Sequence, residues 1–296
     1  CVLAPQQLRA AVPEAQMDGV MGQSIEDETV YKDDIQTEDT RSSLLRSAIS
    51  LLSATSTQAV NTSYTQDFED NSFTTDGDYT SATYYHRSDY EDYQLINGID
   101  VSWWQAKNKT TTLLNWEEIH NAGIDFAFVR VGSRDSSSGS IYEDTAADSH
   151  IQAALENDIN IGLYIFSQAL TEKEAKEEAN FVLNQIKKYN WKVTLPIVID
   201  REKGSYNRLT AGKLSKTKET AVCQAFADTI VEAGYQASVY ASYSWIKSYI
   251  NTDDLTDCGI WIARYNNTTT SNTKSGTAYA DVPYDYDFWQ YSSTSR

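Results

Sequence analysis

The sequence predicts an α/β fold built on a parallel β-sheet, either open or closed into a barrel. From Gln94 onward, short apolar runs alternate with longer amphipathic segments, each long enough for the helix that joins two parallel strands. Several runs are apolar at consecutive positions, which is typical of strands covered on both faces. Repeated strand–helix units of this kind indicate a parallel sheet.

The predicted elements follow in chain order. The strands are the apolar runs at residues 96–101, 124–131, 159–166, 195–199, 236–240, 260–263 and 288–291. Thr171, followed by Glu-Lys-Glu, forms a capping box at the start of a helix whose apolar stripe comprises Ala175, Ala179, Val182, Leu183 and Ile186. A second helix is predicted from about residue 215 to 233, because Gly234 is a favourable residue just beyond a helix end.

Residues 1–93 differ in composition from the rest of the chain. They carry 17 acidic and five basic residues and no Trp. Low hydrophobicity with high net charge predicts a segment that folds poorly alone, although residues 44–52 suit one short amphipathic helix. We therefore expect an acidic, low-complexity segment over 1–93, disordered or partly helical, and a folded domain over 94–296. Residues 64–93 are typical of a solvated linker, either a spacer from a cell surface or a processed tail.

Charge and composition exclude several functional classes. The net charge is −18, which argues against nucleic-acid binding because phosphates would be repelled. No stretch approaches the roughly 18 consecutive apolar residues of a membrane-spanning helix. Three Cys and three His, without a CxxC or HExxH motif, argue against structural zinc and zincin chemistry. Nothing in the sequence indicates a metal or an organic cofactor.

The cysteines leave two questions open. Cys223 and Cys258 are either a disulfide or two buried thiols. Cys1 is either a lipid-modified residue left by removal of a signal peptide or simply the first residue of the sequence as given.

Two acids directly follow one of the predicted strands. In residues 195–202 the apolar run leads into Asp200 and Glu202, and side chains two positions apart in a strand share a face. Both carboxyls therefore point the same way at the carboxyl end of the strand, where barrel enzymes place catalytic groups. Because neighbouring carboxylates repel, one of them should have a raised pKa and keep its proton near neutrality, as glycoside cleavage requires. The alternative is a solvated strand end with ordinary acids.

Two more strands carry acids beside aromatic residues. Asp100 lies near the end of the first strand, and Asp287 precedes the last one. Acids beside aromatic rings suit a sugar site, because rings stack on sugar C–H surfaces while carboxylates bind hydroxyls. The candidate substrate-binding residues are Asp287, Tyr164, Phe166, Tyr240, Trp261 and Trp289. The alternatives are an Asx turn or helix cap at Asp100 and ordinary core packing for each aromatic ring.

Seven segments of the chain, taken in order, resemble the family 25 glycoside hydrolases. These are the Chalaropsis-type lysozymes, found in bacterial cell-wall enzymes and phage endolysins. The segments are residues 98–105 (Gly-Ile-Asp-Val-Ser-Trp-Trp-Gln), 126–130, 162–167 (Gly-Leu-Tyr-Ile-Phe-Ser), 196–202, 233–243, 261–265 and 288–292. The resemblance covers about residues 95–292.

This resemblance implies a distorted (β/α) barrel of the TIM-barrel type and N-acetylmuramidase activity. The bond cut would be the β-1,4 link from N-acetylmuramic acid to N-acetylglucosamine in peptidoglycan, with retention of configuration. Glu202 matches the general acid/base of the family, Asp200 and Asp100 match its partner carboxylates, and Asp287, with Asp285 as the alternative, matches a fourth acid lining the cleft. Whether an Asp or the acetamido group of the substrate attacks the anomeric carbon stays open. We expect a monomer that is secreted or attached to the cell surface or cell wall.

The chain departs from the family pattern at three points. Arg201 stands where a small apolar residue is usual, but by alternation it faces the helices, away from Asp200 and Glu202, so we expect it to be tolerated. Ala106 replaces a common Gly. The sequence ends at Arg296, before a further strand carrying an Asp that the family usually has, so we expect a truncated C-terminus.

Other functions stay open as alternatives. A non-catalytic glycan-binding barrel would have lost its acids, yet Asp100, Asp200 and Glu202 are all present. A chitinase-type glycosidase would carry a longer Asp-rich run ending in Glu on one strand. An amidase or peptidase would need a Cys–His pair or a His cluster, which the sequence does not indicate.

Overall fold

The computed structural model describes residues 83–84, 96–106, 114–203, 208–264, 277–278 and 282–290. The predictions for Cys1, for a helix at 44–52 and for a linker at 64–93 fall almost entirely outside these residues. The proposed boundary between residues 93 and 94 also lies outside them, so the division of the chain stays a prediction.

Within the described residues, one eight-stranded sheet forms the centre of the fold. Seven of its strands pair in parallel, in the order β10 (Phe288–Gln290), β8 (Cys258–Ala263), β7 (Ala237–Ser242), β6 (Ile197–Asp200), β5 (Asn160–Phe166), β3 (Phe126–Arg134) and β2 (Gly98–Val101). A short strand, β4 (Ile141–Glu143), pairs antiparallel with β3. Separately, β1 (Thr83–Tyr84) pairs in parallel with β9 (Thr277–Ala278).

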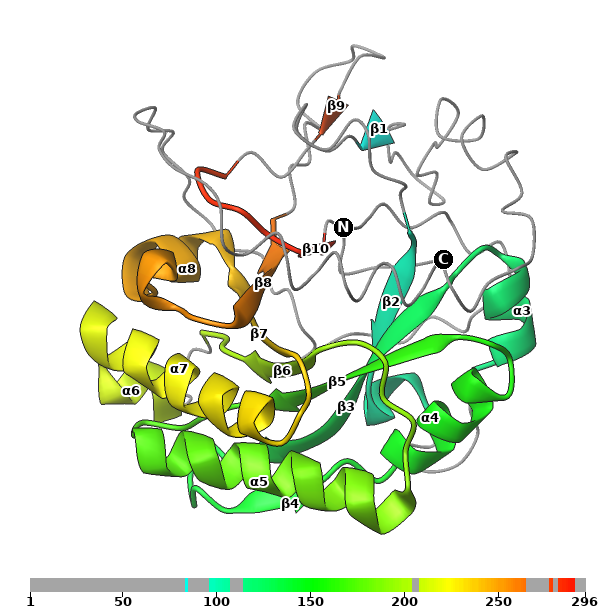
Figure 1. The fold of residues 1–296 in the computed structure, drawn as a ribbon, viewed down its shortest axis with the longest axis horizontal. Helices are drawn as coiled ribbons and strands as arrows, with labels where there is room; N and C mark the ends of the chain where they lie inside the picture. The colour runs from blue at the N-terminus through cyan, green and yellow to red at the C-terminus, as the bar shows by residue number, and fades with distance from the viewer. Residues whose placement is uncertain are drawn as a thin grey trace.

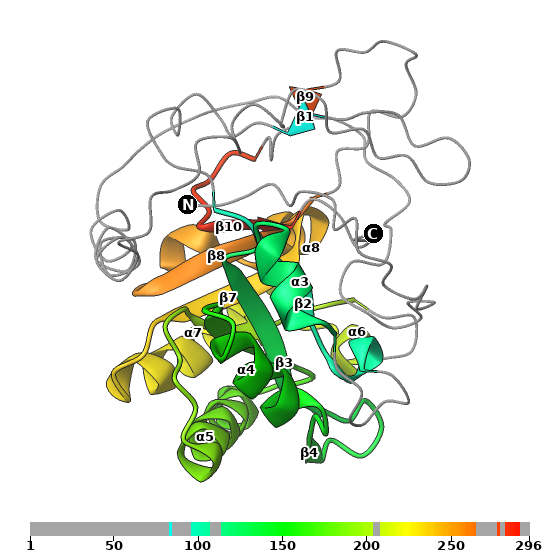
Figure 2. The same cartoon turned by 90° about the vertical axis from the view of Figure 1, so that its right-hand side faces the viewer.

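The sheet curls so that its two edge strands approach each other. Gln290 of β10 donates a hydrogen bond to Asp100 of β2, and Phe288 of β10 packs against Phe126 and Phe128 of β3. The described residues show no backbone pairing between β2 and β10, so the sheet is a half-barrel joined across its opening by side chains. The predicted α/β fold with a parallel sheet of barrel type is confirmed, and β10 and β2 can be followed in Figures 1 and 2.

Helices cover the outer face of the curl (Figure 1). They are α3 (Trp116–Asn121), α4 (Ala147–Leu155), α5 (Glu172–Tyr189), α6 (Arg208–Gly212), α7 (Lys216–Glu232) and α8 (Tyr243–Tyr249), with 3-10 turns η3 (Trp103–Gln105) and η4 (Thr252–Asp254). Within the described residues, none of these helices is long and apolar enough to cross a membrane.

The two helices expected from the sequence form where their caps predict. Thr171 accepts a hydrogen bond from the backbone N–H of Glu174 at 3.2 Å, and α5 ends before Asn190, which is left-handed at φ 54°. Ser215 caps α7 in the same way, and Gly234 follows that helix with φ +86°. Both helices are confirmed. The capping box at Thr171 forms only in part, because Glu174 Oε2 accepts the backbone N–H of Leu170 at 2.7 Å rather than that of Thr171.

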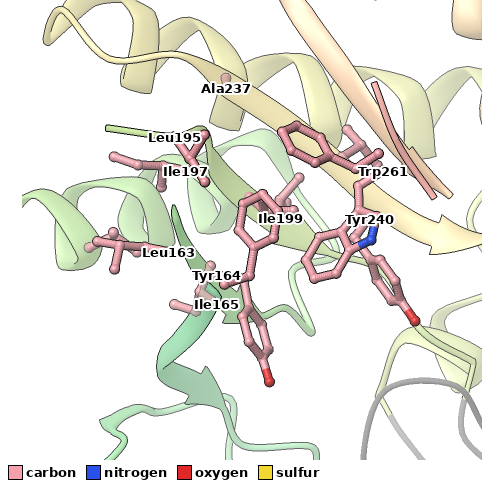
Figure 3. Close-up of a cluster of buried hydrophobic side chains, with 14 of the residues drawn as sticks. Leu163, Tyr164, Ile165, Leu195, Ile197, Ile199, Ala237, Tyr240 and Trp261 are labelled. Carbon is pink, nitrogen blue, oxygen red and sulfur yellow. The ribbon is translucent and has the colours of Figure 1, made fainter. Parts of the chain in front are cut away.

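The centre of the half-barrel is filled by side chains rather than open. Asp200, Tyr240, Trp261 and Phe288 are register partners on four neighbouring strands and form one row across the interior. Figure 3 shows the rings of Tyr164, Tyr240 and Trp261, which belong to the same buried core as the aliphatic side chains of β5 and β6. Cys223 and Cys258 are buried free thiols, which confirms the second of the two cysteine interpretations.

Candidate active site

Asp200 occupies the last position of β6, at the carboxyl end of the parallel strands. The three residues before it are apolar and buried, so the strand carries this carboxylate into the interior of the fold. Asp200 is 0% exposed, and neither of its carboxylate oxygens has a hydrogen-bond partner among the described residues. A buried carboxylate without a partner is costly in free energy, and such groups gather at functional sites.

The electrostatics of Asp200 bring the three predicted acids together. Burial raises the pKa of Asp200 well above its usual range, and the charge of Glu202 raises that pKa further. Asp100 adds to the increase, while the guanidinium groups of Arg130 and Arg201 oppose it. One of two neighbouring acids was expected to have a raised pKa, and the structure places such a shift on Asp200.

Asp100 belongs to the same site through a chain of side-chain hydrogen bonds. Gln290 Nε2 donates to Asp100 Oδ2 at 2.8 Å, and Tyr240 Oη donates to Gln290 Oε1 at 2.8 Å. These contacts run from β7 through β10 to β2 across the opening of the sheet, and Tyr240 is the register partner of Asp200 on the neighbouring strand β6. Burial raises the pKa of Asp100 to about 6, and the hydrogen bond from Gln290 opposes that increase.

Glu202 lies two residues beyond Asp200 and is half-buried, so it is the more accessible of the two acids. Arg201 separates them, and its side chain turns to α7, where Nε and Nη2 donate to the two carboxylate oxygens of Glu219, both at 2.7 Å. The expectation that Arg201 faces the helices is therefore confirmed.

Arg130 is a basic residue of the interior, and it was not among the residues predicted from the sequence. It is the register partner of Tyr164, and its Nε donates to Asp144 Oδ2 at 2.8 Å. The same carboxylate oxygen accepts the backbone N–H of Trp103 at 3.1 Å, so Asp144 fixes both Arg130 and the turn after β2. The signal for Arg130 was its place in the apolar run of β3, where an ionised residue needs a buried partner.

Three of the predicted substrate-binding rings are buried in the core near Asp200. Tyr164, Tyr240 and Trp261 are at most 4% exposed. Trp261 stacks on Phe128 with a centroid distance of 4.3 Å and meets Tyr240 edge to face at 4.6 Å. The rings lie together (Figure 3), and all three are buried in the core rather than exposed to solvent. Phe166, the register partner of Asp200, is half-buried.

Trp289 and Asp287 make their hydrogen bonds to backbone groups rather than to the three acids. Trp289 lies between the inward-facing Phe288 and Gln290, and its indole N–H donates to the carbonyl oxygen of Arg264 at 2.9 Å. Asp287 Oδ2 accepts the backbone N–H of Ile260 at 2.8 Å and lies against Gly259. Both side chains are thus engaged with the backbone in or beside β8.

Gln290 contacts Asp100 but was not predicted from the sequence as a site residue. Alternation within residues 288–291 places Phe288 and Gln290 on one face, so the local signal was present. Among the described residues, no group of three or more His, Cys, Asp or Glu side chains is arranged to hold a metal ion.

Comparisons with known proteins give one family. The model of the family described as glycosyl hydrolases family 25 matches residues 99–296. None of the curated proteins compared with the chain matches it.

Several solved structures are similar to the chain, and the two with a TM-score of 0.50 or more, both of one autolysin, share its fold. The modular autolysin LytC from Streptococcus pneumoniae is 23% identical with a TM-score of 0.51, over 67% of this chain and 43% of the autolysin. The complex of this autolysin with a synthetic peptidoglycan ligand is 23% identical with a TM-score of 0.50, over 67% of this chain and 42% of the autolysin. A family 25 glycosyl hydrolase from Bacillus anthracis is 22% identical with a TM-score of 0.49, over 70% of this chain and 82% of the hydrolase. The chain thus spans less than half of the autolysin, and at these identities the likeness shows the fold.

Proposed function

Because this chain belongs to glycosyl hydrolases family 25, we propose that it is a glycoside hydrolase that cleaves the β-1,4 bond from N-acetylmuramic acid to N-acetylglucosamine in peptidoglycan. The observation that carries the proposal is the shared electrostatic environment of Asp200, Glu202 and Asp100 at the carboxyl ends of β6 and β2. The autolysin LytC, which shares the fold, was solved in complex with a synthetic peptidoglycan ligand, the same class of substrate.

The proposal gives Glu202 the role of general acid and base. Glu202 is half-buried, so its carboxyl reaches both a bound glycan and solvent. As an acid it protonates the glycosidic oxygen of the leaving sugar, and as a base it then takes a proton from the attacking water. These two transfers are the same whether an Asp or the acetamido group of the substrate forms the intermediate.

Asp200 suits stabilisation of positive charge in the transition state. Its ionised form lacks hydrogen-bond partners among the described residues, and burial and neighbouring acids disfavour it. A positive charge that develops on the sugar ring would relieve this penalty, so the interaction grows stronger toward the oxocarbenium-like transition state than in the ground state. Asp100, held by Gln290, would add to the same negative field.

The biological setting belongs to the proposal as well. Peptidoglycan lies outside the cytoplasmic membrane, so the proposed substrate places the protein in secretions or at the cell surface or cell wall. We propose residues 94–296 as the catalytic barrel and residues 1–93 as an acidic segment that precedes it.

The test is hydrolysis of purified peptidoglycan by the full chain and by Glu202→Gln. We expect the variant to fold normally and to lose about 10²–10⁴-fold in rate, because general acid catalysis typically supplies that factor. Glu232→Gln, which changes an exposed acid at the end of α7, is the matched control and should keep full activity.

Mass analysis of the products tests the bond. New reducing ends on muramic acid support the proposal, and reducing ends on N-acetylglucosamine contradict the bond assignment. Near-wild-type turnover by Glu202→Gln refutes the role of Glu202. Tight binding to peptidoglycan without any release of reducing ends indicates the glycan-binding barrel instead.

A further inference from the structure

Arg201 lies between the two proposed acids, and every contact of its side chain is on the outer face of the sheet. It is 0% exposed, and its bidentate ion pair with Glu219 of α7 has both N–O distances at 2.7 Å. Nη1 also donates to Ser167 Oγ at 2.8 Å, and Nη2 to the carbonyl oxygen of Ala169 at 3.0 Å. The guanidinium is therefore held by groups that follow β5 and by the first turns of α7.

Backbone hydrogen bonds also hold the chain on both sides of Arg201 at the end of β6. The carbonyl oxygen of Asp200 accepts the backbone N–H of Ser167 at 3.0 Å, and the backbone N–H of Arg201 donates to the carbonyl oxygen of Tyr240 at 2.8 Å. Glu202 lies beyond the end of β6, so its backbone is no longer fixed by the strand. The side chain of Arg201 adds a constraint on the short segment that carries both acids.

We propose that Arg201, through its buried fork to Glu219 and Ser167, is a positioning residue that fixes the directions of the Asp200 and Glu202 carboxylates. This inference rests on the proposed function of those two acids. The planar guanidinium suits the task, since it engages a carboxylate, a hydroxyl and a carbonyl in one fixed geometry, which an ammonium group does not reproduce.

Stability alone is a poor reason for this arrangement. A buried ion pair gains little over a well-packed apolar pair of similar volume, because removing two charges from water offsets their attraction. Arg201 also acts on the site through its charge, which lowers the pKa of Asp200 against the effects of burial and Glu202. An apolar residue that only packed against α7 would neither fix the geometry of this segment nor lower the pKa of Asp200.

The test replaces the ion pair by apolar side chains in the double variant R201M/E219L. Neither charge is then left buried alone, so the variant should fold, with its Tm within a few degrees of wild type. We expect kcat to fall at least about tenfold with KM within about twofold, because small displacements of reacting groups reduce rate more than binding. The acidic limb of the pH–kcat profile should move to higher pH, because the opposing charge beside Asp200 is gone.

Two companion variants separate positioning from general disturbance. R201K keeps the charge but loses the fork, so it should keep the wild-type pH profile and recover only part of kcat. K188M/E143L makes a similar change at the ion pair between Lys188 of α5 and Glu143 of β4, and it should leave both kcat and the profile in place.

A measurement without substrate keeps the inference independent of the reaction. Titration of the carboxyl carbons by NMR should show a higher pKa for Asp200 and altered Glu202 signals in R201M/E219L. If the wild-type chain releases no reducing ends but these signals change, the proposed function fails and the positioning role stands. A folded double variant with wild-type kcat, pH profile and carboxyl titration would overturn the inference.

Discussion

At the residue scale, Asp100 shows that the site works against folding. Its carboxyl is held where burial raises the pKa from 3.8 to about 6. The folded state therefore binds this proton more tightly than the unfolded state does. The stabilising contribution is complete below pH 4 and is lost as the pH rises through 6, so near neutrality the ionised Asp100 lowers the free energy of unfolding.

Asp100→Asn should therefore stabilise the protein near neutrality. Asn does not titrate and still accepts the hydrogen bond from Gln290 through its amide oxygen. Relative to wild type, the free energy of unfolding of the variant should rise by up to about 3 kcal/mol between pH 4 and pH 8, since a shift of about two pKa units corresponds to that amount. Urea unfolding of both proteins across this pH range measures the difference.

Asp135 provides a control of opposite sign. Four hydrogen bonds from Ser137 and Ser138 hold the pKa of this exposed carboxyl below its usual range. Its contribution is present above the usual pKa and is lost in acid, so Asp135→Asn should be less stable than wild type at neutral pH, and the gap should close toward low pH. A stability difference for Asp100→Asn that does not change with pH would contradict the assigned shift.

Residue-scale contacts across the sheet mark where sequence prediction stops. Strand alternation places Asp200 and Glu202 on one face from local information alone. The hydrogen bond between Gln290 and Asp100 joins positions 190 residues apart, and no local pattern says which two strands will meet at the opening of a curl. Trp289 illustrates the converse, because being aromatic near an acid does not decide which face of β10 a side chain occupies.

At the element scale, β3 and β5 fit together because one presents a ring where the other has none. Phe128 and Gly162 are register partners, and a Cβ on Gly162 would lie 2.3 Å from Phe128 Cε1. The ring cannot move aside, since Phe128 is stacked on Trp261 at 4.3 Å and meets Phe288 at 5.0 Å. Gly162 is thus required by the close approach of a ring rather than by its backbone conformation.

Gly162→Ala should destabilise the fold by about 1–3 kcal/mol, the usual cost of overpacking a core. Chemical denaturation measures this directly. The double variant G162A/F128L removes the ring that the new methyl group would strike, so its loss should be smaller than the sum of the two single losses. Strictly additive losses would show that Gly162 and Phe128 do not constrain each other.

Helix ends could be predicted from the sequence better than strand order, because local residues set the former and long-range packing sets the latter. The start of α5 and both ends of α7 were predicted, because signals such as Thr171 and Gly234 act on backbone groups within one turn. The apolar runs identified the seven parallel strands, but their order in the sheet depends on long-range packing. Periodicity left the sheet open or closed, and the structure shows a curl held together by side chains such as Phe288.

At the scale of the whole molecule, charge and proposed substrate are in conflict. The chain carries a net charge of −18, and peptidoglycan is anionic through the free carboxylates of its stem peptides. An acidic enzyme gains no electrostatic attraction toward such a polymer, and the field that repels the wall extends over a whole surface rather than one residue. The three acids of the site, which the proposed chemistry requires, are already counted in this net charge.

Salt should therefore raise activity on intact walls before any other effect appears. At low ionic strength the repulsion reaches across tens of ångströms, whereas at about 0.1 M salt it is screened within about 10 Å. Raising NaCl from about 10 mM to about 150 mM should increase the initial rate on purified cell walls at least about twofold, because encounter with the polymer becomes faster. A short, soluble glycan fragment with its carboxyls amidated is the matched substrate, and its rate should hardly change, since the buried contacts around Asp200 are poorly screened. A rate on walls that falls steadily from the lowest salt would mean that local cationic groups, not the net charge, govern the encounter.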